Sequence, residues 1–206
     1  MQDLLTKLIQ ICSTLNPPIH PNFLPPALDS DIANAEEQLG LSFPNDLKHL
    51  LLCANGQVVC ENGFVSYPEE TDPIFPMIRF AAGPMGATSS TWLNGVQAIV
   101  ETTGALRSEF QDLKDEADGF EIHGPAYYHD HVIGFTLTEN SDSLVIDLKP
   151  GPGGSVGQVL MVRTQPFQIA VLAPNLSSFM QLVLDGFSSG RFQLGATGFA
   201  GDWGDA

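Results

Sequence analysis

The sequence predicts an α+β protein with an antiparallel or mixed β-meander sheet flanked by helices. The second half of the chain alternates short apolar runs with turn residues, at 132–138, 143–148, 157–163 and 168–173. The connections between these runs are shorter than the dozen or so residues that a parallel crossover needs, so neighbouring strands are expected to run antiparallel. Apolar residues before and after these runs recur at helical spacing, which predicts the flanking helices.

The composition indicates a folded chain with one main domain. A chain of 206 residues is long enough to bury a substantial core. With 43% hydrophobic and 16% charged residues, it is too apolar and too weakly charged to be disordered. We expect an N-terminal helix and Pro-rich tether at 1–27, the domain at 28–194, and a loose Gly/Asp-rich tail at 195–206.

Three helices are expected near the N-terminus, at 4–12, 29–40 and 44–56. The first stops before a pair of prolines, which cannot continue a helix. The second is expected to start with Asp29 as its cap and to close at Gly40. The third ends at an Asn-Gly pair, so the second and third should form two helices joined by a tight turn.

The middle of the chain is less regular. The stretch 61–90 contains prolines and glycines without a sustained period, which predicts a long surface loop. Residues 92–100 restore a helical stripe, with Trp92 in the core, and a separate helical segment is expected after Gly104. The clearest helical stripe follows the last strand; we expect Asn175 to cap it and the helix to cover one face of the sheet.

Acidic residues strongly outnumber basic ones, and this excess argues against some classes of binding partner. Eight Lys and Arg residues face 24 Asp and Glu residues, which gives a formal net charge of −16. Nucleic acid and anionic membranes bind through clusters of basic side chains, and the sequence has no such cluster. A basic protein is favoured instead, because complementary fields speed its encounter with the acidic chain.

The cysteines and the N-terminus indicate a cytoplasmic protein. Cys12, Cys53 and Cys60 are odd in number, so they cannot all pair internally, and we interpret them as reduced thiols. Polar residues interrupt the first apolar run, unlike in an export signal. No stretch approaches the length of about 18 apolar residues that a membrane span requires.

Three stretches, taken together, resemble the SUKH superfamily, which includes fungal cell-wall assembly regulators and many bacterial immunity proteins. Residues 32–56 read IANAEEQLGLSFPNDLKHLLLCANG, similar to the family's helix, Leu-Gly, Leu-Pro, helix, Asn-Gly opening. Residues 132–162 carry the acidic turn, the Ile-Asp-Leu strand, the Pro-Gly loop and the Gly-Gln-Val strand in order. Residues 173–190 resemble the closing helix.

The resemblance implies a helix-flanked mixed sheet, no enzymatic activity and no cofactor. Its bacterial members are immunity proteins that bind a secreted toxin, so the leading hypothesis is a non-catalytic immunity protein with a basic toxin domain as its partner. The alternative is a regulatory protein-binding adaptor similar to the fungal regulators. The long disordered flanks of the fungal proteins are absent from this sequence, which favours the immunity hypothesis.

Aromatic residues beside acidic ones are the candidate partner contacts, because interfaces gain most of their energy from a few aromatic or Arg side chains with polar surroundings. Two acidic residues on the turn after the first strand are added because they are expected to be exposed. The predicted contacts are Tyr67, Glu69, Glu70, Asp72, Tyr127, Tyr128, Asp130, Glu139 and Asp142.

Other patterns suggest chemistry but have a simpler interpretation. Ser188 lies in a Gly-x-Ser-x-Gly string that lacks the strand required before the Ser. The Gly-rich loop 151–157 leads into a strand, which favours a wide hairpin over a phosphate cradle. His129 and His131 would share a strand face, but zinc needs three or four ligands. Asp147 is interpreted first as a structural carboxylate that holds the adjacent Pro-Gly loop, and second as a partner contact.

Overall fold

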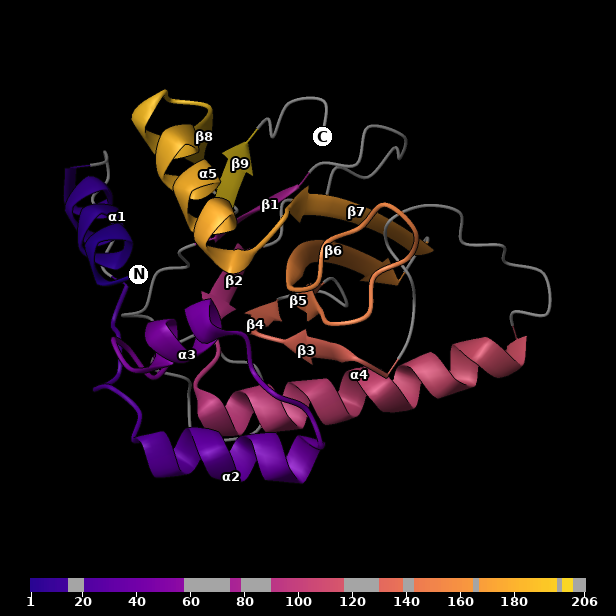
Figure 1. Ribbon diagram of the computed structural model, residues 1–206. Helices are drawn as coiled ribbons and strands as arrows, with labels where there is room; N and C mark the ends of the chain where they lie inside the picture. Colours follow the sequence, from indigo (N-terminus) through magenta and orange to yellow (C-terminus); the bar gives the residue numbers. More distant parts are fainter. Residues whose placement is uncertain are drawn as a thin grey trace.

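The computed structural model, shown in Figure 1, describes residues 1–14, 21–57, 75–78, 90–116, 130–138, 143–164, 167–195 and 198–201. Within these residues, helices flank two sheets in an α+β arrangement, which confirms the predicted fold class. The helices are α1 (Gln2–Thr14), α2 (Asp29–Leu39), α3 (Asn45–Leu51), α4 (Val96–Glu116) and α5 (Leu176–Ser188). The strands are β1 (Phe75–Ile78), β2 (Ser90–Leu93), β3 (Val132–Gly134), β4 (Thr136–Thr138), β5 (Ser143–Asp147), β6 (Gln158–Thr164), β7 (Phe167–Ala173), β8 (Phe192–Gly195) and β9 (Gly198–Gly201).

The antiparallel four-stranded sheet has the order β3-β5-β6-β7. Its last three strands are consecutive antiparallel neighbours, so the predicted meander is confirmed. Along β6, Val159 and Met161 belong to the larger core cluster, whereas Leu160 and Val162 belong to a smaller one. Because successive side chains point to opposite faces, both faces of this sheet are buried.

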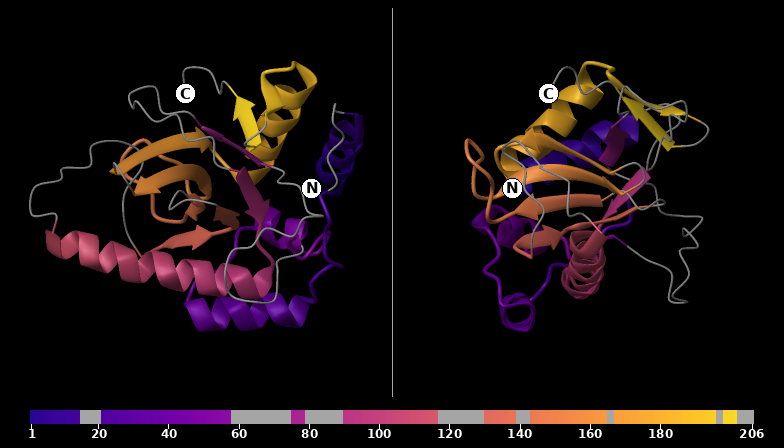
Figure 2. Two further views of the ribbon diagram at one scale, coloured as in Figure 1. Left: turned by 180° about the vertical axis from the view of Figure 1, so that it is seen from behind. Right: turned by 90° about the vertical axis from the view of Figure 1, so that its right-hand side faces the viewer.

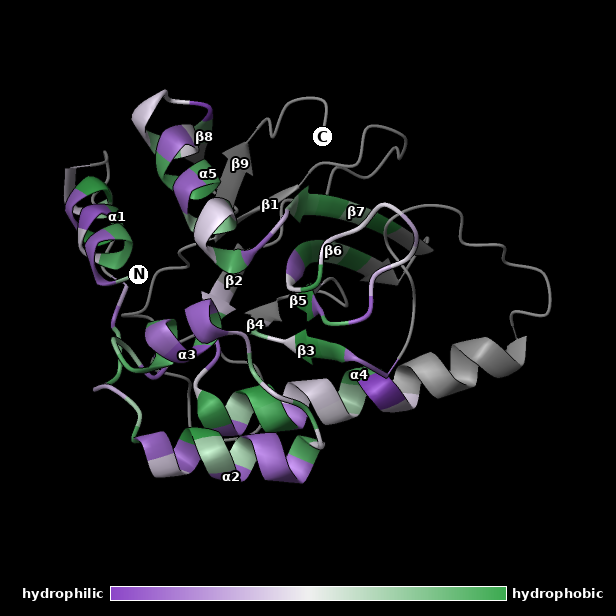
Figure 3. Ribbon diagram, in the orientation of Figure 1, coloured by the Kyte–Doolittle hydropathy of each residue, from purple (hydrophilic) through white to green (hydrophobic). Residues whose placement is uncertain are grey.

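Helices pack against the four-stranded sheet from two sides, with α5 over one face and α4 running along β3 (Figure 2). On one face α5 supplies apolar residues such as Phe179 and Met180, and α1 lies beside α5 and adds Leu8 to the same core. On the other face Leu106 of α4 packs against the smaller cluster. Figure 3 shows the resulting pattern, in which much of β6 and β7 is hydrophobic while α2 and α3 carry hydrophilic stretches. No helix in the described ranges is long and apolar enough to span a bilayer.

The predicted single strand at 132–138 is wrong, because the chain changes sheets at Phe135. β3 pairs with β5 in the four-stranded sheet, whereas β4 pairs with β2 in the other. The Phe135 side chain is fully buried and meets the Phe179 ring edge-on, with the centroids 6.1 Å apart. Its carbonyl accepts a hydrogen bond from the backbone N–H of Asn94 at 3.0 Å, and this bond fixes the corner.

A five-stranded sheet of order β4-β2-β1-β9-β8 corrects two further expectations. The stretch 61–90, predicted to be a loop, contains β1 and the first residue of β2, which pair antiparallel. The tail, predicted to be loose from residue 195, contributes β9, which pairs in parallel with β1 and antiparallel with β8. Both strands gain their order from pairing with partners distant in sequence, which local composition does not reveal.

The segment after residue 90 also differs from its prediction. Trp92 is buried, as expected, but it lies in β2 opposite Leu137 and not on a helix. Helix α4 then runs without a break through Gly104, where a second helical segment was expected. A helical Gly costs only about 1 kcal/mol relative to Ala, and the packing of Ile99 and Leu106 on either side offsets that cost.

The ends of helices α2 and α5 can be compared with the capping residues predicted from the sequence. Gly40 closes α2 with a left-handed φ of 64°, as predicted. The N-cap of α2 is Leu28, which has no side-chain acceptor, so Asp29 is the first helical residue and not the cap. At α5 the expected cap is confirmed, because the side chain of Asn175 accepts a hydrogen bond from the backbone N–H of Ser178 at 2.8 Å.

Candidate partner-binding surface

All but one of the predicted contact residues lie outside the described residues. Asp130 is the exception; it is exposed and lies two residues before β3. The others stay predictions, and they are Tyr67, Glu69, Glu70, Asp72, Tyr127, Tyr128, Glu139 and Asp142.

The structure describes some of the residues whose sequence patterns suggested catalysis or metal binding. Ser188 is the last residue of α5, so a helix precedes it, where a nucleophile elbow has a strand. His131 is exposed, and its carbonyl accepts a hydrogen bond from Leu148 N at 2.9 Å; His129 lies outside the described residues. Among the side chains that the structure describes, no three His, Cys, Asp or Glu residues gather in a metal-binding group.

Asp147 is fully buried at the end of β5 and holds the adjacent loop, as its first interpretation predicted. One carboxylate oxygen, Oδ1, accepts a hydrogen bond from the backbone N–H of Lys149 at 2.9 Å. The other, Oδ2, accepts from Nε2 of Gln158 at 2.9 Å, directly across the β5–β6 pair. A buried carboxylate without partners is costly, so these bonds make Asp147 part of the fold.

The loop between β5 and β6 is tied to the same pair of side chains. The Oε1 atom of Gln158 accepts from Ser155 N at 3.1 Å, and Gly157 N donates to the Asp147 carbonyl at 2.7 Å. The loop leads into β6, as the hairpin interpretation predicted. It exposes Val156, whose relative accessible area is 73%.

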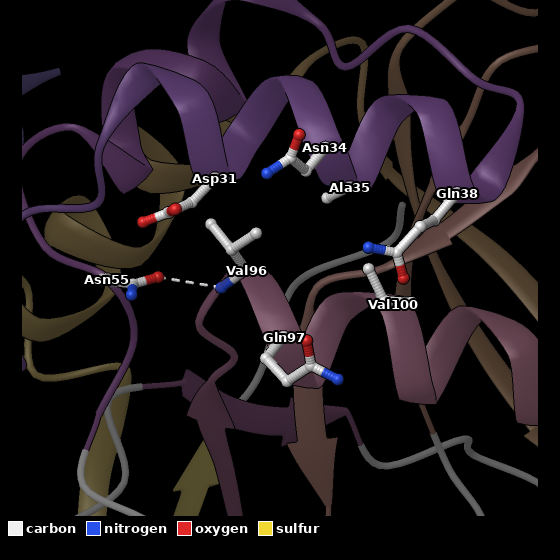
Figure 4. Close-up of a pocket in the computed structure, with 8 residues that line it drawn as sticks. All are labelled: Asp31, Asn34, Ala35, Gln38, Asn55, Val96, Gln97 and Val100. Atoms are coloured by element: carbon white, nitrogen blue, oxygen red, sulfur yellow. Dashed lines mark hydrogen bonds between the residues drawn. The ribbon is translucent and has the colours of Figure 1, made fainter.

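A polar cleft lies between α2 and α4, two helices that pack side by side (Figure 4). Its volume is about 220 Å³. On one side α2 contributes the polar side chains of Asp31, Asn34 and Gln38 beside the buried Ala35. On the other side α4 contributes Gln97, and its Val96 and Val100 point toward α2. The complete lining is Asp31, Asn34, Ala35, Gln38, Asn55, Val96, Gln97 and Val100.

The start of α4 is fixed to the end of the α3 segment, which sets one end of the cleft. Oδ1 of Asn55 accepts a hydrogen bond from the first backbone N–H of α4, at Val96, at 2.8 Å. Gly56 has a φ of 81° and approaches Gly95 so closely that a Cβ there would overlap its backbone. The sequence predicted that the third helix ends at this Asn-Gly pair, but α3 already ends at Leu51, and the pair instead fixes the start of α4.

The two basic side chains near α2 are engaged away from the cleft. Nζ of Lys48 forms an ion pair with Glu36 at 2.8 Å. Nη1 of Arg107 donates to the carbonyl of Leu39 at 3.0 Å, at the C-terminal end of α2. Asp31 is the one charged residue among those lining the cleft, so the local charge is negative.

The sequence did not reveal the cleft, although part of its signal is visible. Asp31, Asn34 and Gln38 follow one another at helical spacing, so they share a face of α2. Their neighbours Asn55 and Gln97 come from other elements, and their proximity depends on how α2 and α4 pack. A polar stripe on a helix otherwise indicates only a solvated face.

Comparison with protein-family models supports the resemblance noted from the sequence. The model described as the SMI1 / KNR4 family (SUKH-1) matches residues 26–182, well over half of the chain. The match includes α2 to α4, the four-stranded sheet and the first half of α5. No curated protein matches the chain.

Proposed function

Because the chain belongs to the SMI1/KNR4 family (SUKH-1), we propose that it is a non-catalytic, cytoplasmic immunity protein that binds and neutralises a cognate toxin. The net charge of −16 is the observation that favours a basic toxin domain as the partner. Opposite fields accelerate association and disfavour acidic competitors. The proposal includes no metal and no cofactor.

The distribution of charge on the described surface supports this choice. Helix α2 carries four carboxylates and no Lys or Arg, and Lys48 of α3 neutralises one of them. The exposed carboxylates of α2 are those of Asp29, Asp31 and Glu37. A basic toxin surface would find complementary charge here without displacing an internal ion pair.

Co-expression tests the proposal directly. The immunity proposal predicts that a toxic domain is encoded next to this chain; that domain is expressed with and without the chain, and cell survival and complex formation are measured. We expect protection and a stable complex, with an association rate that falls steeply as salt is raised, because salt screens the attraction. Failure to protect and failure to form a complex would reject the immunity role.

The alternative is a regulatory adaptor, and membership of the same family fits it equally, since the superfamily that the sequence resembles includes fungal cell-wall assembly regulators. An adaptor engages several partners with moderate affinity, whereas an immunity protein has one tight partner. Quantitative affinity capture from the native host distinguishes the two. Several partners that exchange within seconds favour the adaptor, and one that stays bound favours the immunity protein.

A further inference from the structure

We propose that the α2–α4 cleft receives a cationic segment of the protein partner, with a Lys or Arg side chain placed against Asp31. The carboxamides of Asn34, Gln38 and Gln97 would then pair with the peptide groups beside that side chain. This inference rests on the proposed function in that it names the surface at which the basic partner binds.

The size of the cleft favours a protruding protein side chain over a small metabolite. Pockets for drug-sized ligands have volumes of about 300–1,000 Å³. The α2–α4 cleft, at about 220 Å³, is smaller and is open along the groove between the helices. It therefore suits one long side chain with its adjoining backbone.

The polar side chains that α2 contributes to the cleft are available for a partner. In the described part of the chain, no hydrogen bond or ion pair involves the side chains of Asp31, Asn34 or Gln38. Each carboxamide offers both donors and an acceptor, which is the combination that a peptide group needs. The Asp31 carboxylate offers acceptors alone, so it selects a donor, and a guanidinium can meet it with two parallel hydrogen bonds.

The charge around the cleft favours a cation. Lys48 and Arg107, the nearby basic residues, are committed to Glu36 and to the Leu39 carbonyl, so neither neutralises Asp31. Nε2 of Gln97 donates to Glu101 at 2.9 Å, which places a second carboxylate beside the lining of α4. An anionic segment would meet these two carboxylates, and no Lys or Arg is among the residues that line the cleft.

An exposed apolar residue adjoins the acidic end. Leu28, the N-cap of α2, has a relative accessible area of 65%, and its carbonyl accepts a hydrogen bond from Asp31 N at 3.0 Å. Interfaces commonly place an apolar contact beside the charged group that it shields from water. Its exposed side chain would offer an apolar contact to the stem of a Lys or Arg side chain bound at Asp31.

A random-peptide display library, selected against the full-length protein, tests the inference without knowledge of the partner. We expect the selected peptides to be enriched in Arg and Lys, and Asp31→Lys to weaken their binding at least tenfold. Asn34→Ala and Gln38→Ala should each weaken it about threefold. NMR shift changes on the wild-type protein should be largest at residues lining the cleft.

Asp3→Lys is the matched control, because Asp3 is also an exposed carboxylate in the first turn of a helix. It produces the same change in net charge and should alter peptide binding less than twofold. Urea unfolding of both variants establishes that they fold, and Asp31→Asn provides a milder change at the same position. Selection of non-cationic peptides, shift changes located elsewhere, or equal losses in Asp3→Lys and Asp31→Lys would overturn the inference.

The two proposals can fail separately. If the toxin is neutralised and bound as tightly by Asp31→Lys as by the wild type, the cleft is not the docking surface and the immunity role stands. If cationic peptides bind the cleft but no toxin is neutralised, the docking surface stands and the immunity role is rejected.

Discussion

Asp147 and Asp31 are both carboxylates next to carboxamide side chains, yet their surroundings are opposite. Asp147 is fully buried, and its two oxygens accept hydrogen bonds from Gln158 and from the backbone of Lys149. Asp31 is exposed in the α2–α4 cleft and forms no hydrogen bond or ion pair with any described side chain. The neighbouring carboxamides of Asn34 and Gln38 likewise form no hydrogen bond with any described residue.

The difference in burial and hydrogen bonding distinguishes polar residues that stabilise the fold from polar residues that can bind a partner. A buried carboxylate stabilises the native structure because only that structure brings its hydrogen-bond donors into place. Removing the carboxylate leaves those buried donors unsatisfied. An exposed, unpaired carboxylate contributes little to stability. We therefore expect substitutions of Asp147 and its partners to affect folding, and substitutions of the unpaired side chains of the cleft, such as that of Asp31, to affect binding.

The largest expected effect is on folding, from Asp147→Ala. The change leaves Nε2 of Gln158 and the N–H of Lys149 without their acceptor and opens a small cavity. It should lower the free energy of unfolding by about 3 kcal/mol, measured by urea denaturation. Asp147→Asn keeps one acceptor and should lose about half as much. A loss below about 0.5 kcal/mol, the level of an ordinary surface substitution, would contradict the structural role.

The second prediction concerns the attachment of α4. Asn55→Ala removes the acceptor for the first N–H of the helix, at Val96, as the loss of an N-cap does. We expect a loss of about 1 kcal/mol in the free energy of unfolding and faster amide exchange at the start of α4. Asn34→Ala is the control, because it removes the same side chain from a position with no described partner. Equal losses in the two variants would refute the capping role.

Elements defined by local signals were predictable from the sequence. Asn175 caps α5 and Gly40 closes α2, because these end signals act within a few residues. The role of Asp147 followed from its place in an apolar strand before a Pro-Gly loop, where a carboxylate must find partners.

Features that depend on distant partners were not predictable. Phe135 looks like an ordinary strand residue, and the chain turns there because Phe179 and Asn94 hold it from other elements. The cleft escaped prediction for the same reason, since Asn55 and Gln97 meet α2 only after α4 has packed. A polar helix face has the same sequence pattern whether it faces water or a partner.

A smaller effect is expected from the ion pair that directs basic charge away from the cleft. Lys48→Met should lower the free energy of unfolding by about 0.5 kcal/mol, because both partners remain partly exposed, with side-chain accessibilities of 33% for Lys48 and 20% for Glu36. The loss should shrink at 1 M NaCl, where screening weakens the wild-type pair. Lys7→Met, on the exposed face of α1, is the control. A loss that salt does not change would indicate packing of the Lys48 stem.

The smallest expected effect on stability is that of Asp31→Asn. Asp31 lies in the first turn of α2, where a carboxylate favours the helix dipole by about 0.3 kcal/mol. Asp3→Asn, at the equivalent place in α1, should cost a similar amount by urea denaturation. The two variants should differ in the binding of cationic peptides, which Asp31→Asn weakens and Asp3→Asn leaves unchanged. If Asp31→Asn instead cost 2 kcal/mol or more, the Asp31 carboxylate would serve the fold as Asp147 does, and the contrast between the two carboxylates would fail.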